Sequence, residues 1–133
     1  QMGAWGVQAF ENDDAMDFAA DLVDADSLDV VATSFEAIVP GEYLEAPDCC
    51  IALAAAEVVA ALRGSTGTSL PQDVSAWARS TALRPDDALL DAARQAVGRI
   101  GERSELKELW QDSDHFDVWM QAVRDLETRL GAA

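Results

Sequence analysis

Apolar residues recur at spacings of three and four along most of the chain, which places them on one face of an α-helix. The pattern predicts helices at six or seven places, separated by short segments rich in Gly, Pro, Ser and Asp. No stretch of useful length alternates between polar and apolar residues, so no β-sheet is expected. The sequence therefore predicts an all-α fold, a compact bundle of six to seven helices with an extended N-terminal segment.

Residues typical of helix ends mark several boundaries. Asn12 is a good N-cap for the first helix, and the acids after it favour a first helical turn. Pro47 begins another helix, and Gly64 ends it. Gly101 is expected to end a later helix, and the last helix is expected to begin near Asp114. Each boundary rests on local chemistry alone.

The helix that begins at Pro47 is apolar nearly all round, which predicts that it lies at the centre of the fold. Within Cys49–Leu62 the only charged residue is Glu57. A buried carboxylate needs either a partner or a proton. Two interpretations of Glu57 stay open. It has a structural role, either in an ion pair with one of the arginines later in the chain or at the edge of a polar face, or it is the acid of a site in a cleft.

The length and composition indicate one domain. Half of the 133 residues are apolar, which is enough for a single continuous core over residues 1–133. Cys49 and Cys50 are adjacent and match no metal or redox spacing, so we expect small core residues in a reducing compartment. Neither a signal peptide nor a membrane-spanning segment is expected. The sequence therefore predicts a soluble cytoplasmic protein.

Negative charge is concentrated in the first half of the chain. The formal net charge is −16, and the thirteen Asp and Glu of residues 1–62 are accompanied by no Lys or Arg. This charge repels nucleic-acid phosphates and anionic membrane surfaces, so neither is expected to bind directly. A basic protein partner, a bound cation or simple solubility remain as explanations of the charge.

Four acids of the first helix follow each other at helical spacing. Carboxylates three and four residues apart on a helix lie close enough to share a hard cation, or they form a solvated polar face. An EF-hand is excluded, because a loop from Asp24 would need Gly at Asp29 and Glu at Phe35. The members of this stripe are Asp14, Asp17, Asp21 and Asp24.

The only histidine lies among acids near the start of the last helix. The residues of this group are Asp112, Asp114, His115 and Asp117. They suit a metal site or an acid–base pair, and Asp114 alternatively caps the last helix. The sequence contains no nucleophile elbow, phosphate-binding loop or dinucleotide fingerprint. No cofactor is therefore expected, and the interpretation leans away from an enzyme.

The opening Gly3-Ala4-Trp5-Gly6, followed by Phe10 and Asn12-Asp13-Asp14-Ala15, resembles the start of a bacterial family known as domain of unknown function 4259. The resemblance continues at 54–62, 104–106 and 109–110, so it spans essentially the whole chain. It implies no activity, cofactor or catalytic residue. It marks the following residues as core, caps and a shared polar pocket together: Trp5, Asn12, Asp13, Asp14, Glu57, Glu105 and Trp110.

Three functions are consistent with these observations. The first is a non-catalytic interaction protein, such as an immunity-like or inhibitory partner of a basic protein, whose acidic half steers association. The second is a small metal-binding protein or metal-dependent hydrolase that uses Asp13, Asp14 and Glu57, or the group around His115. The third is a mimic of DNA with spaced surface carboxylates. The sequence leaves the partner and the oligomeric state open.

Overall fold

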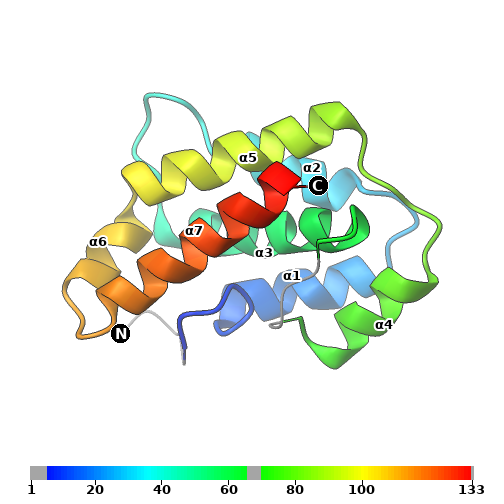
Figure 1. Cartoon of the computed structure of the whole chain (residues 1–133), viewed down its shortest axis with the longest axis horizontal. Coiled ribbons are helices and arrows are strands. Elements are labelled where there is room, and N and C mark those ends of the chain that lie inside the picture. The colour runs from blue at the N-terminus through cyan, green and yellow to red at the C-terminus, as the bar shows by residue number, and fades with distance from the viewer. Residues whose placement is uncertain (1–5, 66–69, 133) are drawn as a thin grey trace.

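The computed structural model describes residues 6–65 and 70–132, and within these ranges the chain forms seven α-helices and no β-strand (Figure 1). The predicted all-α fold is confirmed. In chain order the helices are α1 (Asp13–Val23), α2 (Asp29–Glu36), α3 (Ala46–Leu62), α4 (Gln72–Ser80), α5 (Asp87–Glu102), α6 (Glu105–Gln111) and α7 (Phe116–Ala132). Each of these helices contacts the next one in sequence, except that α4 does not contact α5.

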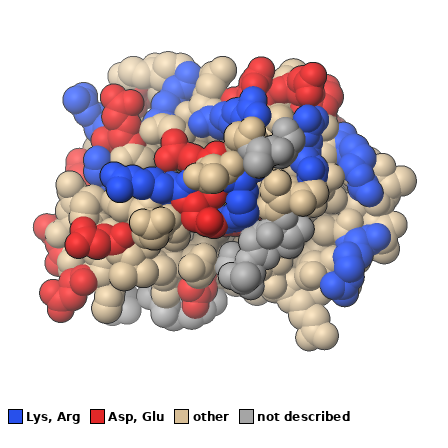
Figure 2. All heavy atoms as spheres, viewed as in Figure 1, with Lys and Arg blue, Asp and Glu red and all other residues tan. Residues whose placement is uncertain are grey.

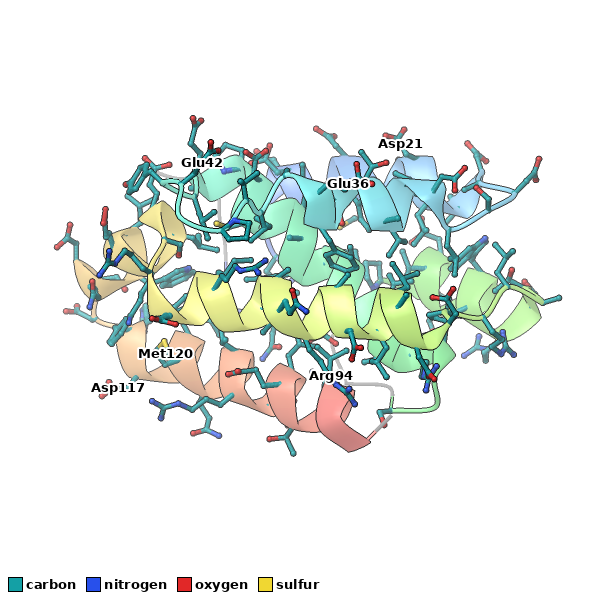
Figure 3. The ribbon with its side chains drawn as sticks, turned by 90° about the horizontal axis from the view of Figure 1, so that it is seen from above. Asp21, Glu36, Glu42, Arg94, Asp117 and Met120 are labelled. Carbon is teal, nitrogen blue, oxygen red and sulfur yellow. The ribbon has the colours of Figure 1, made fainter. Side chains whose placement is uncertain are left out.

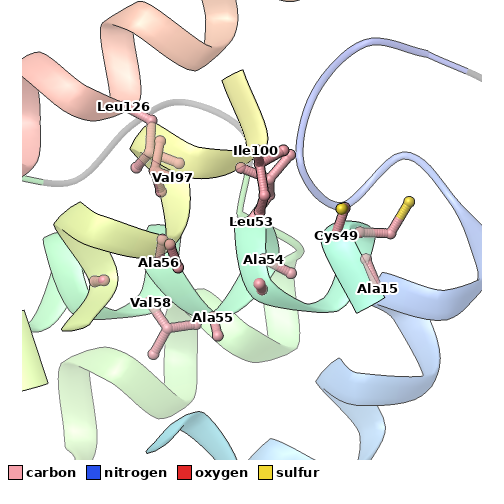
Figure 4. Close-up of a cluster of buried hydrophobic side chains, with 14 of the residues drawn as sticks. Ala15, Cys49, Leu53, Ala54, Ala55, Ala56, Val58, Val97, Ile100 and Leu126 are labelled. Atoms are coloured by element: carbon pink, nitrogen blue, oxygen red, sulfur yellow. The ribbon is translucent and has the colours of Figure 1, made fainter. Parts of the chain in front are cut away.

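Helix α3 lies at the centre of the fold, as its all-round apolar pattern predicts. It contacts each of the six other helices, and 13 of its 17 residues are buried. Ala54, Ala55 and Ala56 are completely buried, and their small side chains allow the surrounding helices to approach closely (Figure 4). Figure 4 also shows Ala15 of α1, and Val97 and other residues from α5 and α7, around this stretch of α3.

The other helices form two groups around α3. In the described ranges, α1 contacts α2, α3 and α4, whereas α5, α6 and α7 contact one another. The contact between α2 and α5 joins the two groups directly. Figure 1 shows α1 along one edge of the molecule, away from α5, and Asp13, Asp17 and Asp21 of this helix are exposed to solvent.

Polar side chains cap three helices. Asn12, Asp86 and Ser104 precede α1, α5 and α6, and each accepts a hydrogen bond from the backbone amide three residues further on, at 2.8, 2.8 and 3.0 Å. The Nδ2 of Asn12 also donates to the carbonyl oxygen of Ala9 at 3.1 Å. These bonds satisfy amides that have no partner inside the helix. The predicted cap at Asn12 is confirmed.

Two helix boundaries differ from the predicted ones by one or two residues. Helix α5 continues past Gly101, where the absence of a side chain serves packing: a Cβ there would lie 3.2 Å from Cγ1 of Val123 on α7. Helix α7 begins at Phe116, two residues after Asp114. The residues before it form a turn in which the Ser113 hydroxyl accepts a backbone hydrogen bond at 3.1 Å. Asp114 therefore lies before the helix, exposed in that turn.

Candidate functional site

Glu57 is the one buried charged residue of ranges 6–65 and 70–131, with 3% of its surface exposed. Its two carboxylate oxygens accept hydrogen bonds from Nη1 and Nη2 of Arg129, at 2.7 and 2.8 Å. This bidentate geometry is the strongest arrangement for the two groups. The prediction that Glu57 pairs with a later arginine is confirmed. Because both oxygens are engaged, the geometry gives no support to a free site acid.

Arg129 connects three parts of the fold. Besides Glu57 on α3, its Nε donates to Asp125 one turn earlier on α7, at 2.8 Å, and Nη1 lies 3.5 Å from the carbonyl oxygen of Ser65. Only 16% of the arginine side chain is exposed. The hydrogen bonds that Arg129 donates to Glu57, and the one that it donates to Asp125, raise the pKa of Arg129 above its already high ordinary value. Arg129 is therefore permanently charged, and its role is to tie α7 to α3.

Glu105 and Trp110 also have structural roles. The Oε1 of Glu105 accepts a hydrogen bond from the backbone amide of Ala46 at 2.7 Å, which caps the start of α3. The backbone amide of Glu105 donates to the carbonyl oxygen of Leu44 at 2.9 Å, so α6 holds the loop that leads into α3. Trp110 is 7% exposed and belongs to the core.

Among residues 6–65 and 70–131, three of the residues marked by the resemblance line two separate small cavities. Asn12 and Trp110 line one cavity of about 20 Å³, and Glu57 lines another of about 20 Å³. A volume of this size holds little more than a single water molecule. Trp5 lies outside the described residues. In the described ranges these residues therefore have separate roles: Asn12 and Glu105 cap helices, Trp110 packs in the core and Glu57 forms an ion pair.

The metal-ligand candidates do not converge. Among residues 6–65 and 70–131, no three His, Cys, Asp or Glu side chains are grouped as a metal site requires. Asp13 is exposed and Asp14 half-buried at the start of α1, whereas Glu57 is engaged by Arg129. The second candidate group is exposed to solvent throughout: Asp112, Asp114, His115 and Asp117.

Cys49 and Cys50 are buried in α3, with 0% and 6% of their surface exposed, as the sequence predicts. Burial raises the pKa of both thiols to about 12. Since the thiolate is the nucleophilic form, both residues remain unreactive thiols at neutral pH. They act as small core residues.

Acidic side chains cover the outer surface of α1, α2 and the start of α3. We call this surface the acidic face: Asp13, Asp14, Asp17, Asp21, Asp24, Asp29, Glu36 and Asp48. Figure 3 shows Asp21 and Glu36 along the edge of the molecule opposite Arg94 and α7. In the described ranges the ion pairs engage Asp87, Asp91, Glu57 and Asp125, so no member of the acidic face takes part.

A family model described as Domain of unknown function (DUF4259) matches residues 3–122. The chain belongs to the DUF4259 family. The resemblance of its opening residues to this family is therefore confirmed. No curated protein and no solved structure matches the chain. Within the described ranges of this DUF4259 protein, every helix is too short or too polar to cross a membrane.

Six of the nine Lys and Arg of this DUF4259 chain lie on α5, α6 and α7 or in the turn between α5 and α6. All nine Lys and Arg follow Leu62 in the sequence, and those of α5 and α7 mix with acids on one surface (Figure 2). Arg94, for example, pairs with Asp91 one turn away, at 3.2 Å. The surface of α1 and α2 is therefore acidic, whereas the surface of α5 and α7 carries charges of both signs.

Two grooves flank α2, and the sequence did not predict either. The α1–α2 groove has a volume of about 360 Å³ and is lined by Asp14, Asp17, Phe18, Asp21, Val30, Thr33, Ser34, Ala37, Asp48 and Ile51. The α2–α5 groove has a volume of about 770 Å³. Its lining includes Leu28, Asp29, Phe35, Val39, Asp86, Ala88, Leu89 and Arg99. Val30 of α2 lines the first groove and Phe35 of α2 lines the second, so apolar residues on two sides of one helix were the available signal.

Proposed function

We propose that this DUF4259 protein is a non-catalytic binding domain that recognises a basic protein through its acidic face, as an immunity or inhibitor protein of a bacterial cytoplasm does. One observation carries the proposal. Of the acids in residues 6–62, only Glu57 has an ion-pair partner in the described ranges. The remaining carboxylates are uncompensated, and such a surface attracts and orients a partner of opposite charge.

The arrangement of acids on α1 supports a role outside the fold. Asp14, Asp17, Asp21 and Asp24 are spaced so that like charges repel along the helix. Asp21 and Asp24 also lie at the C-terminal end of α1, where the helix dipole disfavours negative charge. The last turn of α1 contains no basic residue. Charges that work against their own helix are expected where function, and not stability, selects the residue.

The chemistry of the interior favours binding over catalysis. The buried carboxylate is held by Arg129, and the buried thiols are protonated at neutral pH. The grooves contain aspartates and apolar groups without a histidine or cysteine. A binding role needs none of these reactive groups. It needs an exposed surface of defined charge, and the acidic face supplies one.

Capture from the native host tests the proposal. The bait is the tagged chain, incubated with lysate and washed at low salt, and bound proteins are then eluted at about 0.5 M NaCl, where exposed charges are strongly screened. A second bait, the α1-reversed variant, has three exposed acids of α1 and its C-cap reversed: Asp17→Lys, Asp21→Lys and Asp24→Lys. The control bait has three exposed acids of the other helix group or its loops reversed: Glu102→Lys, Asp112→Lys and Glu127→Lys.

We expect mass spectrometry to find one basic protein in stoichiometric amount on the wild-type and control baits, released by salt and missing from the α1-reversed bait. The control matters because both triple variants have the same net charge. A partner that all three baits retain equally would contradict the proposal. The same holds if the wild-type bait captures nothing.

A further inference from the structure

We infer that the α1–α2 groove receives an apolar side chain of the partner, inserted between lysines or arginines that pair with the carboxylates around the groove. This inference rests on the proposed function and deepens it, because it names the docking position and the chemistry of the segment that docks. The occupant is a basic, amphipathic segment of the partner protein.

The floor of the groove is apolar. Phe18 of α1 is 4% exposed, and Val30 of α2 and Ile51 of α3 are half-buried beside it. The volume of about 360 Å³ lies at the lower end of the range for ligand pockets, roughly 300–1,000 Å³. This space suits a few side chains and not a whole helix. An apolar side chain placed there would remove both itself and the floor from water.

Carboxylates line the groove from two helices. Asp14, Asp17 and Asp21 come from α1, and Asp48 comes from the first turn of α3. No Lys or Arg lines the groove. An apolar side chain flanked by basic residues therefore matches both the floor and the rim. A second copy of this chain does not match, since its own acidic face would be repelled.

The α2–α5 groove is larger but differs in charge. Arg99 lies in its lining and donates to the carbonyl oxygen of Ile38 on the loop after α2, at 3.4 Å. The lining also contains Asp29, Glu36 and Asp86, so its charge is mixed, whereas the α1–α2 groove has four carboxylates and no base. The α2–α5 groove is therefore expected to attract a basic segment less strongly. The two grooves share helix α2, so they provide a matched comparison within one protein.

The test fills each groove in turn with the same side chain. Ala37→Phe places a ring in the α1–α2 groove, and Ala88→Phe places one in the α2–α5 groove; both alanines are exposed. The probe is a fluorescein-labelled synthetic helical peptide of Lys and Leu, with Leu on one face, measured by fluorescence anisotropy. We expect Ala37→Phe to raise the Kd about tenfold or more and Ala88→Phe to change it less than about twofold.

A second peptide, in which every Leu is replaced by Ser, separates this inference from the proposed function. Equal affinity for both peptides, or a larger effect of Ala88→Phe, overturns the docking position. Salt-sensitive binding that the α1-reversed variant loses would then still support the acidic face. If neither peptide binds at low salt, both proposals fail. A dimer of the chain that Ala37→Phe disrupts, detected by sedimentation, would also overturn the inference.

Discussion

Replacing Arg129 with Met is expected to lower the free energy of unfolding by about 3–5 kcal/mol, the cost of leaving a buried carboxylate without its partner. Glu57 has 3% of its surface exposed, so water cannot replace the two hydrogen bonds that the guanidinium donates. The substitution also releases Asp125 and the carbonyl oxygen of Ser65. Urea unfolding followed by circular dichroism measures the change.

Two further variants distinguish a structural pair from a site acid. Glu57→Gln keeps the shape and should cost about 1–2 kcal/mol, because Arg129 retains Asp125 and one amide oxygen. The double variant Glu57→Met with Arg129→Met should be more stable than Arg129→Met alone, since no buried charge remains. If Arg129→Met unfolds at the same urea concentration as the wild type, the pair does not hold α7 to α3. Glu57 would then become a site candidate again.

Replacing Asp21 with Lys is expected to stabilise the protein by about 1–2 kcal/mol at low salt. The exposed carboxylate of Asp21 lies one helical turn from both Asp17 and Asp24, so the substitution turns two repulsive pairs into attractive ones. It also places a positive charge in the last turn of α1, where the helix dipole favours it. Thermal unfolding at low ionic strength measures the gain.

Asp13→Lys is the matched control on the same helix. It makes the same chemical change in the first turn, where the dipole favours the acid. We expect no comparable gain, because the lost dipole interaction offsets the relief of repulsion with Asp17. The gain from Asp21→Lys should shrink at high salt, since exposed charges are screened there. A loss of stability in Asp21→Lys would show that this carboxylate serves the fold, contrary to the argument for function.

The fold could be predicted largely from local patterns. Asn12 and Ser104 each stand before a run of helically spaced apolar residues, and their side chains cap the helices that follow. Helix α3 is apolar nearly all round, which places it at the centre of the fold. The prediction that Gly101 ends a helix failed because glycine also occurs where two helices pack closely. Here its lack of a side chain lets Val123 of α7 approach. Only the packing of α5 against α7 decides between the two.

The candidate sites were less predictable. The burial of Glu57 follows from its apolar helix, but its partner is 72 residues away and is one of eight arginines. The choice depends on how α7 crosses α3. The grooves beside α2 depend on the angles at which α1, α2 and α5 pack, which side-chain spacing does not determine. The acidic face could be predicted in part. The sequence shows that the first half of the chain is acidic, but it does not show that these carboxylates lack ion-pair partners in the folded protein.

The most direct test of the central claim, that the acidic face of α1 and α2 attracts a basic partner, is the association rate of the captured partner at rising ionic strength. Stopped-flow fluorescence compares the wild type, the triple α1 reversal and the triple control reversal. We predict that the wild-type and control rates fall about tenfold or more between low salt and about 0.5 M NaCl, and that the α1 reversal is slow throughout. Equal rates with equal salt dependence for all three proteins would contradict the account.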